Sequence, residues 1–90
     1  MFQDTAQMTN KQKYDTVFMD TFSLQQAALG QDLAYSHIDE WDSIGHMQMI
    51  AALEETFNIT METDDIVNFS SYTKGFEILS KYAISFERTP

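Results

Sequence analysis

The chain has 90 residues and a formal net charge of −9 at pH 7, with 14 acidic and 5 basic residues. This length indicates one domain without room for a two-domain catalytic cleft, and the acidic surface disfavours nucleic acid and anionic membranes, which require clustered positive charge. No cysteine is present, which excludes disulfides, thiolate metal sites and cysteine nucleophiles.

Residues 1–8 are predicted to form a flexible N-terminal tail, and residues 1–10 lack the apolar run of a signal peptide. No stretch approaches the roughly 18 apolar residues of a membrane span, so we expect a cytoplasmic protein without membrane insertion. The predicted domain covers residues 9–84, and residues 85–90 are expected to form a short solvated C-terminal tail.

The first predicted helix is capped by Thr9 or Asn10 and ends near Leu24. Its apolar positions have helical spacing: Tyr14, Val17, Phe18, Met19 and Phe22. A long connection follows, from about residue 25 to residue 42, and connections of this length are often functional. Its apolar residues are expected to anchor it on the helices: Leu29, Leu33, Ile38 and Trp41.

The second predicted helix runs from about Ser43 to Phe57 and ends at the C-cap residue Asn58. Its buried face follows the i, i+3, i+4, i+7 and i+11 spacing: His46, Met49, Ile50, Leu53 and Phe57. Asp42 is its predicted N-cap, so Ser43 lies in the first turn. Free backbone N–H groups and the helix dipole there favour an anionic group, such as a phosphate ester, on the serine hydroxyl.

Two shorter helices complete a predicted all-α fold. Thr63 is expected to cap a short third helix that has two aspartates in its first turn and ends near Asn68. Ser70 or Ser71 is expected to cap the fourth helix. The apolar stripe of that fourth helix is Tyr72, Phe76, Leu79, Tyr82 and Ala83.

Gly45 follows Ser43 closely and has two interpretations. Glycine lowers helix propensity by about 1 kcal/mol relative to alanine, so it could loosen the first turn and help an enzyme to grip the serine. Alternatively, it could give clearance to Trp41 or to another helix. The two interpretations have equal weight at the level of sequence.

Other kinds of site fit the sequence poorly. A Ser-His-Asp hydrolase built on Ser43 and His46 lacks the G-x-S-x-G elbow, and His46 belongs to the predicted buried face. His37, Asp39 and Glu40 in the long connection are too small a set for a confident metal site. A calcium loop in the same connection fails the required ligand spacing.

The run Trp41-Asp42-Ser43-Ile44 resembles the Asp-Ser-Leu signature of acyl carrier proteins, with isoleucine in place of leucine. The segment Ala51–Ile59 is similar to the end of that family's second helix, and Asp65–Phe69 is similar to its short third helix. The resemblance covers roughly residues 9 to 83. The preceding tryptophan is more similar to stand-alone carriers of specialised pathways, including D-alanyl and peptidyl carriers, than to the fatty acid carrier.

This resemblance implies an acyl-carrier-like four-helix bundle with a long loop between helices 1 and 2 and a short third helix. It also implies that a phosphopantetheinyl transferase attaches 4′-phosphopantetheine from coenzyme A to Ser43, with Asp42 as helix cap and part of the motif. The thiol of this arm then carries an acyl or aminoacyl group as a thioester. The chain is thus expected to be a carrier and not an enzyme.

The resemblance further implies several partners in fatty acid or specialised acyl biosynthesis. A ligase or acyltransferase loads the cargo, a synthase or transferase consumes it, and the carrier itself is expected to be a monomer. Partner recognition is predicted to use the exposed side of the second helix: Ile44, Met47, Gln48, Ala51, Glu54 and Glu55. The flexible Met47 suits differently shaped partners, although a methionine at helical spacing also serves ordinary packing. Neutral Gly45 and Gln48 depart from the acidic second helix of the fatty acid carrier.

The competing hypothesis is an unmodified acidic helical adaptor that binds protein partners. Four amphipathic helices fit both hypotheses, and the negative charge either suits basic partner surfaces or simply keeps the protein in solution. Ser43 discriminates between them, because its hydroxyl is essential to a carrier and dispensable to an adaptor.

Overall fold

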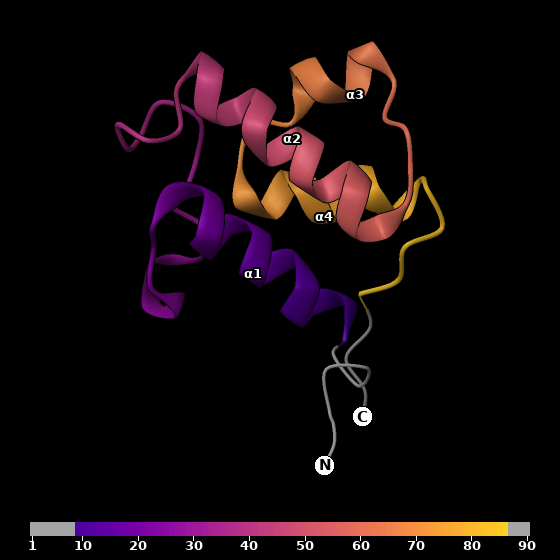
Figure 1. Ribbon diagram of the computed structural model, residues 1–90, viewed down its shortest axis with the longest axis horizontal. Coiled ribbons are helices and arrows are strands. Elements are labelled where there is room, and N and C mark those ends of the chain that lie inside the picture. The colour runs from indigo at the N-terminus through magenta and orange to yellow at the C-terminus, as the bar shows by residue number, and fades with distance from the viewer. Residues whose placement is uncertain (1–8, 87–90) are drawn as a thin grey trace.

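The computed structural model describes residues 9–86 as four α-helices and one short 3-10 helix (Figure 1). Their bounds are α1 Asn10–Phe22, η2 Gln26–Ala28, α2 Ser43–Phe57, α3 Thr63–Asn68 and α4 Tyr72–Ser80. No strand lies within this range, where Ala34 and Ser71 form an isolated antiparallel bridge. The all-α prediction is therefore confirmed for the described residues, and the predicted tail of residues 1–8 lies outside them.

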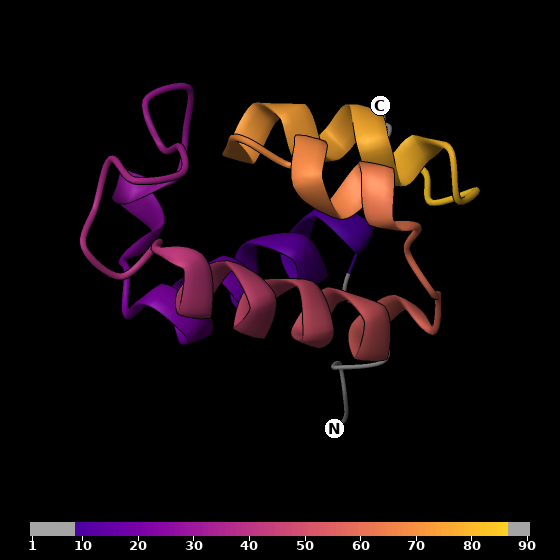
Figure 2. The ribbon, with the colours of Figure 1, turned by 90° about the horizontal axis from the view of Figure 1, so that it is seen from above.

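The helices α1 and α2 run side by side in opposite directions (Figure 1), and α4 lies on the side of the molecule away from α2 (Figure 2). Figure 2 shows α3 beside α4, and the connection between α1 and α2 at the end of the molecule where α2 begins. This arrangement brings the long connection, the first turn of α2 and the segment before α4 to the same end.

The ends of α1 follow from local hydrogen bonds. Thr9 Oγ1 accepts a hydrogen bond from the Gln12 N–H at 3.1 Å, and Gln12 Oε1 accepts one from the Thr9 N–H at 2.9 Å, which completes a capping box. The structure thus selects Thr9 over Asn10 as the cap. The helix ends at Phe22, before the predicted Leu24, because Ser23 takes the left-handed conformation with φ 56°.

The centre of the core is aromatic. Trp41 is fully buried and stacks on Phe22, with ring centroids 5.2 Å apart and an interplanar angle of 22°. The Phe18 ring packs edge to face against the same indole, with ring centroids 5.5 Å apart. Of the predicted anchors in the long connection, Leu33 and Trp41 are buried, while Leu29 and Ile38 are partly buried.

A buried carboxylate that the sequence analysis did not single out joins α1 to α4. Asp15 is only 3% exposed and accepts hydrogen bonds from the Tyr72 hydroxyl and from Lys11 Nζ, the latter at 2.8 Å. Tyr14 donates its hydroxyl hydrogen to the Tyr72 carbonyl oxygen at 2.6 Å. Burial is the main cause that raises the pKa of both tyrosines, so they remain protonated donors.

Two residues of the predicted buried face of α2 need correction. His46 and Phe57 are half-buried: the His46 ring bonds to the Ile66 carbonyl oxygen of α3, and Phe57 is the last residue of α2. Ala83 is exposed, because the chain turns out of α4 after Ser80 and Ala83 takes a positive φ of 66°.

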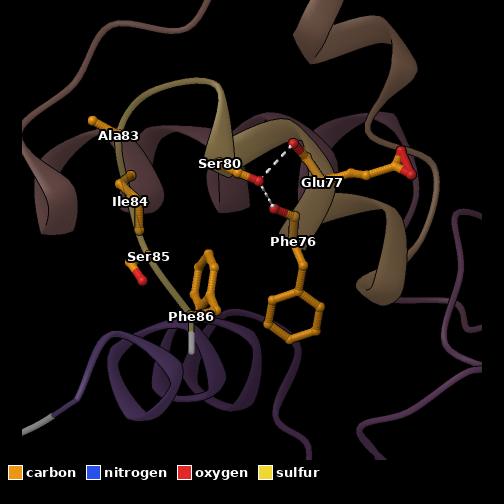
Figure 3. Close-up of a pocket in the computed structure, with 7 residues that line it drawn as sticks. All are labelled: Phe76, Glu77, Ser80, Ala83, Ile84, Ser85 and Phe86. Atoms are coloured by element: carbon orange, nitrogen blue, oxygen red, sulfur yellow. Dashed lines mark hydrogen bonds between the residues drawn. The ribbon is translucent and has the colours of Figure 1, made fainter. Parts of the chain in front are cut away.

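The predicted C-terminal tail of residues 85–90 also needs correction at its start. Phe86 is partly buried and contacts Phe76 edge to face, with ring centroids 4.9 Å apart (Figure 3). Asn10 Nδ2 donates a hydrogen bond to the Ser85 carbonyl oxygen at 2.9 Å. Residues 85 and 86 therefore belong to the packed domain, because they cover the aromatic side chains of α1 and α4, and residues 87–90 lie outside the described part.

The start of α3 is held by side chains that follow α4. The predicted cap at Thr63 is wrong by one position, since Glu62 is the N-cap residue and makes no side-chain capping bond. Instead, the Glu62 N–H donates to the Tyr82 hydroxyl at 2.9 Å, and that hydroxyl donates to Asp65 Oδ2 at 2.5 Å. Lys81 Nζ donates to Asp65 Oδ1 at 2.6 Å.

Replacement of Asp65 by asparagine should weaken the protein at neutral pH and reduce its sensitivity to acid. Hydrogen bonds from Lys81 and Tyr82 hold the pKa of Asp65 below its usual range. A lowered native pKa stabilises the fold above the unfolded value of about 3.9, and this stability is lost as the pH falls through the native pKa. Thermal melting as a function of pH measures the effect. Asp64→Asn, an exposed neighbour, is the matched control, and a parallel acid profile for Asp65→Asn and wild type contradicts the prediction.

Candidate functional site

Ser43 is exposed at the first position of α2, at the end of the molecule where the long connection arrives (Figure 2). Asp42 Oδ1 accepts a hydrogen bond from the Gly45 N–H at 2.9 Å, so the predicted cap at Asp42 is confirmed. The Asp42 carbonyl oxygen accepts the first helical bond, from the His46 N–H at 2.8 Å. These bonds fix the backbone of the turn while the serine hydroxyl remains accessible.

Gly45 provides clearance for the chain that crosses α2. A Cβ atom at this position would lie 2.0 Å from the Glu40 carbonyl oxygen and 3.2 Å from a ring carbon of Phe22. Close approach, rather than a loosened turn, is therefore what the glycine provides. The nearest atoms belong to Glu40 of the long connection and to Phe22 of α1.

His46 links three elements around Ser43. The indole N–H of Trp41 lies 2.9 Å from His46 Nδ1, and because an indole nitrogen can only donate, Nδ1 is the acceptor. In the neutral ring the proton is then on Nε2, which lies 2.8 Å from the Ile66 carbonyl oxygen of α3. His46, predicted on the buried face of this helix, is thus a half-buried histidine with two hydrogen bonds.

This geometry argues against a Ser-His-Asp hydrolase. A general base must lie within hydrogen-bond reach of the serine hydroxyl. Both nitrogens of His46 are instead directed at Trp41 and Ile66, so neither is free to accept a proton from Ser43. The hydroxyl of Ser43 has a different neighbour.

That neighbour is Tyr35, which the sequence analysis missed. The Tyr35 hydroxyl lies 3.3 Å from Ser43 Oγ, and its ring meets His46 edge to face with centroids 5.7 Å apart. The Tyr35 N–H donates to the Ser70 carbonyl oxygen at 3.0 Å. No helical spacing rule connects a residue of the long connection with Ser43, because the contact depends on the bridge between this connection and the segment before α4.

A pocket of about 320 Å³ opens beside Ser43. Residues of α2, of α3 and of the two segments joined by the Ala34–Ser71 bridge line it: Tyr35, Ser43, His46, Met47, Ile66, Val67, Phe69 and Ser70. Its walls are mostly apolar, with a few hydroxyl groups and one imidazole at defined places, a combination typical of small-molecule sites.

Two exposed apolar side chains line this pocket, and a third, Ile44, follows Ser43 directly in the chain. Ile44 is 71% exposed, Met47 is 52% exposed, and Val67 of α3, which the sequence analysis did not single out, is 72% exposed. The other residues of the predicted partner face are placed as follows: Gln48, Ala51 and Glu55 are exposed, and Glu54 is half-buried. The Glu54 carboxylate accepts a hydrogen bond from the Met61 N–H at 2.9 Å, so it holds the turn after α2 and is less available to a partner.

A second hollow, of about 560 Å³, lies between α4 and the segment that follows it (Figure 3). The hydroxyl of Ser80 points to the carbonyl oxygens of Phe76 and Glu77, at 3.0 and 3.2 Å. Because this hydroxyl bonds to its own helix, the hollow offers an apolar surface rather than a reactive group.

Other site classes find little support among the described residues. Within residues 9–86, no three histidine or acidic side chains come together as a set that could hold a metal ion. His37 Nδ1 instead lies 3.0 Å from the Asp32 carbonyl oxygen. None of the helices in this range is long and apolar enough to cross a membrane.

No protein-family model, curated protein or solved structure matches this chain. The interpretation of the site therefore depends on its own residues and their geometry.

The clearance at Gly45 predicts that Gly45→Ala lowers the free energy of unfolding by about 1–3 kcal/mol, although alanine is the better helix former. The reason is the 2.0 Å approach to a main-chain oxygen. Urea unfolding followed by circular dichroism measures it. Gly30→Ala is the matched control and should change stability by less than about 0.5 kcal/mol, because nothing lies within 4 Å of its added Cβ. Equal effects at the two positions contradict the assignment.

The hydrogen bonds of His46 predict that its neutral ring carries the proton on Nε2. Long-range proton–nitrogen correlation spectra of the folded protein distinguish the two ring nitrogens. In Trp41→Phe, which keeps an aromatic ring but removes the donor to Nδ1, this preference should weaken. A neutral ring protonated on Nδ1 in the wild type is the contrary result.

Proposed function

We propose that this chain is an acyl carrier protein and that Ser43 receives 4′-phosphopantetheine from coenzyme A. The observation that carries the proposal is an exposed serine hydroxyl in the first turn of α2, beside a mostly apolar pocket of about 320 Å³. The chain contains no cysteine, so any thiol must come from an attached group.

The residues around Ser43 fit such a group. The first turn of a helix has N–H groups without helical partners, and the helix dipole stabilises a nearby negative charge by about 0.3–1 kcal/mol. The hydroxyl is exposed, so a modifying enzyme can reach it. Asp42 and Gly45 fix the backbone of the turn from which the Ser43 side chain projects.

In the loading step, Ser43 Oγ bonds to the phosphorus atom that bears the pantetheine. The bond from this phosphorus to the bridging oxygen of coenzyme A breaks, adenosine 3′,5′-bisphosphate leaves, and Ser43 loses its proton. His46 does not take this proton, because both of its nitrogens are directed elsewhere. We assign the base to the transferase.

The attached group supplies the thiol, and with it a thioester bond to an acyl or aminoacyl cargo. Met47, Ile66 and Val67 give the neighbouring pocket an apolar wall. Each methylene group buried there contributes about 0.8 kcal/mol, which favours cargo with an aliphatic portion close to its attachment point.

We further propose that the helices form an acyl-carrier-like bundle. The protein works as a cytoplasmic monomer that is not itself an enzyme. A loading ligase or acyltransferase and a downstream synthase or transferase bind the surface around Ile44, Met47 and Val67. Exposed apolar residues on a chain of net charge −9 suit enzymes with an apolar contact surface and a basic rim.

A promiscuous phosphopantetheinyl transferase and coenzyme A should add one 4′-phosphopantetheine to the wild type, at Ser43. Intact mass and peptide fragmentation measure the modification. Ser43→Ala should stay unmodified with an unchanged circular dichroism spectrum, because the hydroxyl makes only an exposed contact. Ser70→Ala, which removes another exposed hydroxyl from the same pocket, should load fully. An unmodified wild type sinks the carrier proposal and favours the unmodified adaptor.

A further inference from the structure

We propose that Tyr35 binds the prosthetic group of the modified protein, by donating its phenolic hydrogen to the phosphodiester on Ser43. This inference rests on the proposed function, since it concerns the state after attachment. Its basis is the placement of Tyr35, which core packing does not explain because the side chain is 42% exposed.

The main chain holds Tyr35 in place on both sides of the isolated bridge. The Tyr35 N–H donates to the Ser70 carbonyl oxygen at 3.0 Å, and the Tyr72 N–H donates to the Leu33 carbonyl oxygen at 2.9 Å. Leu33 and Tyr72 are both buried. The backbone of Tyr35 is therefore attached to the start of α4 and does not move as a free loop.

The ring of Tyr35 is held in turn by His46. The two rings meet edge to face, with centroids 5.7 Å apart and an interplanar angle of 86°. His46 cannot rotate without losing its bonds to Trp41 and Ile66. The backbone bond to Ser70 and the ring contact with His46 thus hold the exposed phenol of Tyr35 with its hydroxyl 3.3 Å from Ser43 Oγ.

Attachment changes what the two hydroxyl groups can do. In the unmodified protein either hydroxyl can donate to the other. Esterification replaces the hydrogen of Ser43 Oγ with phosphorus, so afterwards this oxygen only accepts, and negatively charged phosphate oxygens lie next to it. Tyr35 becomes the donor, and an O–H group bonds to a charged oxygen more strongly than to a neutral one, at about 2.5–2.7 Å.

The charge distribution supports a neutral donor in this role. Between Lys13 and Lys74 the sequence contains no lysine or arginine, so the segments that surround Ser43 provide no cation for the phosphate. Lys74 follows closely after these segments but pairs with Glu77 at 2.9 Å. A phenol supplies a hydrogen bond without adding a positive charge to the surface that partners bind.

The test is a thermodynamic cycle with Tyr35→Phe, which keeps the ring and removes only the hydroxyl. Melting temperatures are measured for the unmodified and modified forms of the wild type and the variant. Attachment should raise the melting temperature by about 2–5 °C more in the wild type than in Tyr35→Phe. Ser80→Ala is the control: it also removes one hydroxyl, which bonds only to the Phe76 and Glu77 carbonyl oxygens of its own helix, so its response to attachment should equal that of the wild type.

Nuclear magnetic resonance gives a second readout that does not depend on enzymatic activity. The phosphorus signal of the modified protein should shift in Tyr35→Phe and stay in place in Ser80→Ala. In the wild type, attachment should move the ring-carbon signal next to the Tyr35 hydroxyl more than that of any other tyrosine. Equal melting responses with an unmoved phosphorus signal overturn the role of Tyr35, while loading at Ser43 still upholds the proposed function. Absence of loading in the wild type overturns the proposed function itself.

Discussion

The indole of Trp41 is the contact on which the geometry of the site depends. It is fully buried against Phe22 of α1, and its one N–H group bonds to His46 of α2. Asp42 and Ser43 follow it directly in the chain, so the aromatic core determines where α2 begins. His46 extends the same constraint to α3 through its bond to the Ile66 carbonyl oxygen. A substituent at Ser43 is thus presented by a turn that three helices support.

Polar contacts complement this aromatic centre at the places where helices meet. Buried Asp15 joins α1 to the first residue of α4, and Asp65 joins α3 to the chain after α4. Each carboxylate has two side-chain donors, so its charge is compensated where it leaves water. Because these bonds require particular partners, they determine which helices pack against each other. The apolar contacts supply most of the driving force for folding.

The helices and the exposed serine could be predicted from sequence because their signals are local. Caps at Asp42 and Ser71 and the apolar periodicity of α2 depend on residues within a few positions of one another. The neighbours of Ser43 could not be predicted, because Tyr35 reaches it through a bridge between distant segments. The packing of Phe86 was missed for the same reason, since its partners lie in α1, α2 and α4.

The construction of α3 has a consequence for the pocket that it lines. A helix of six residues is too short to persist by itself in water, so its order depends on the bonds that Asp65 and Ile66 make to neighbouring elements. Local opening of a short segment with few buried contacts generally costs less free energy than global unfolding. The wall of the pocket that α3 forms is therefore its most deformable part. This wall can move outward at the cost of the three hydrogen bonds that Asp65 and Ile66 make to neighbouring elements, without disruption of the aromatic core.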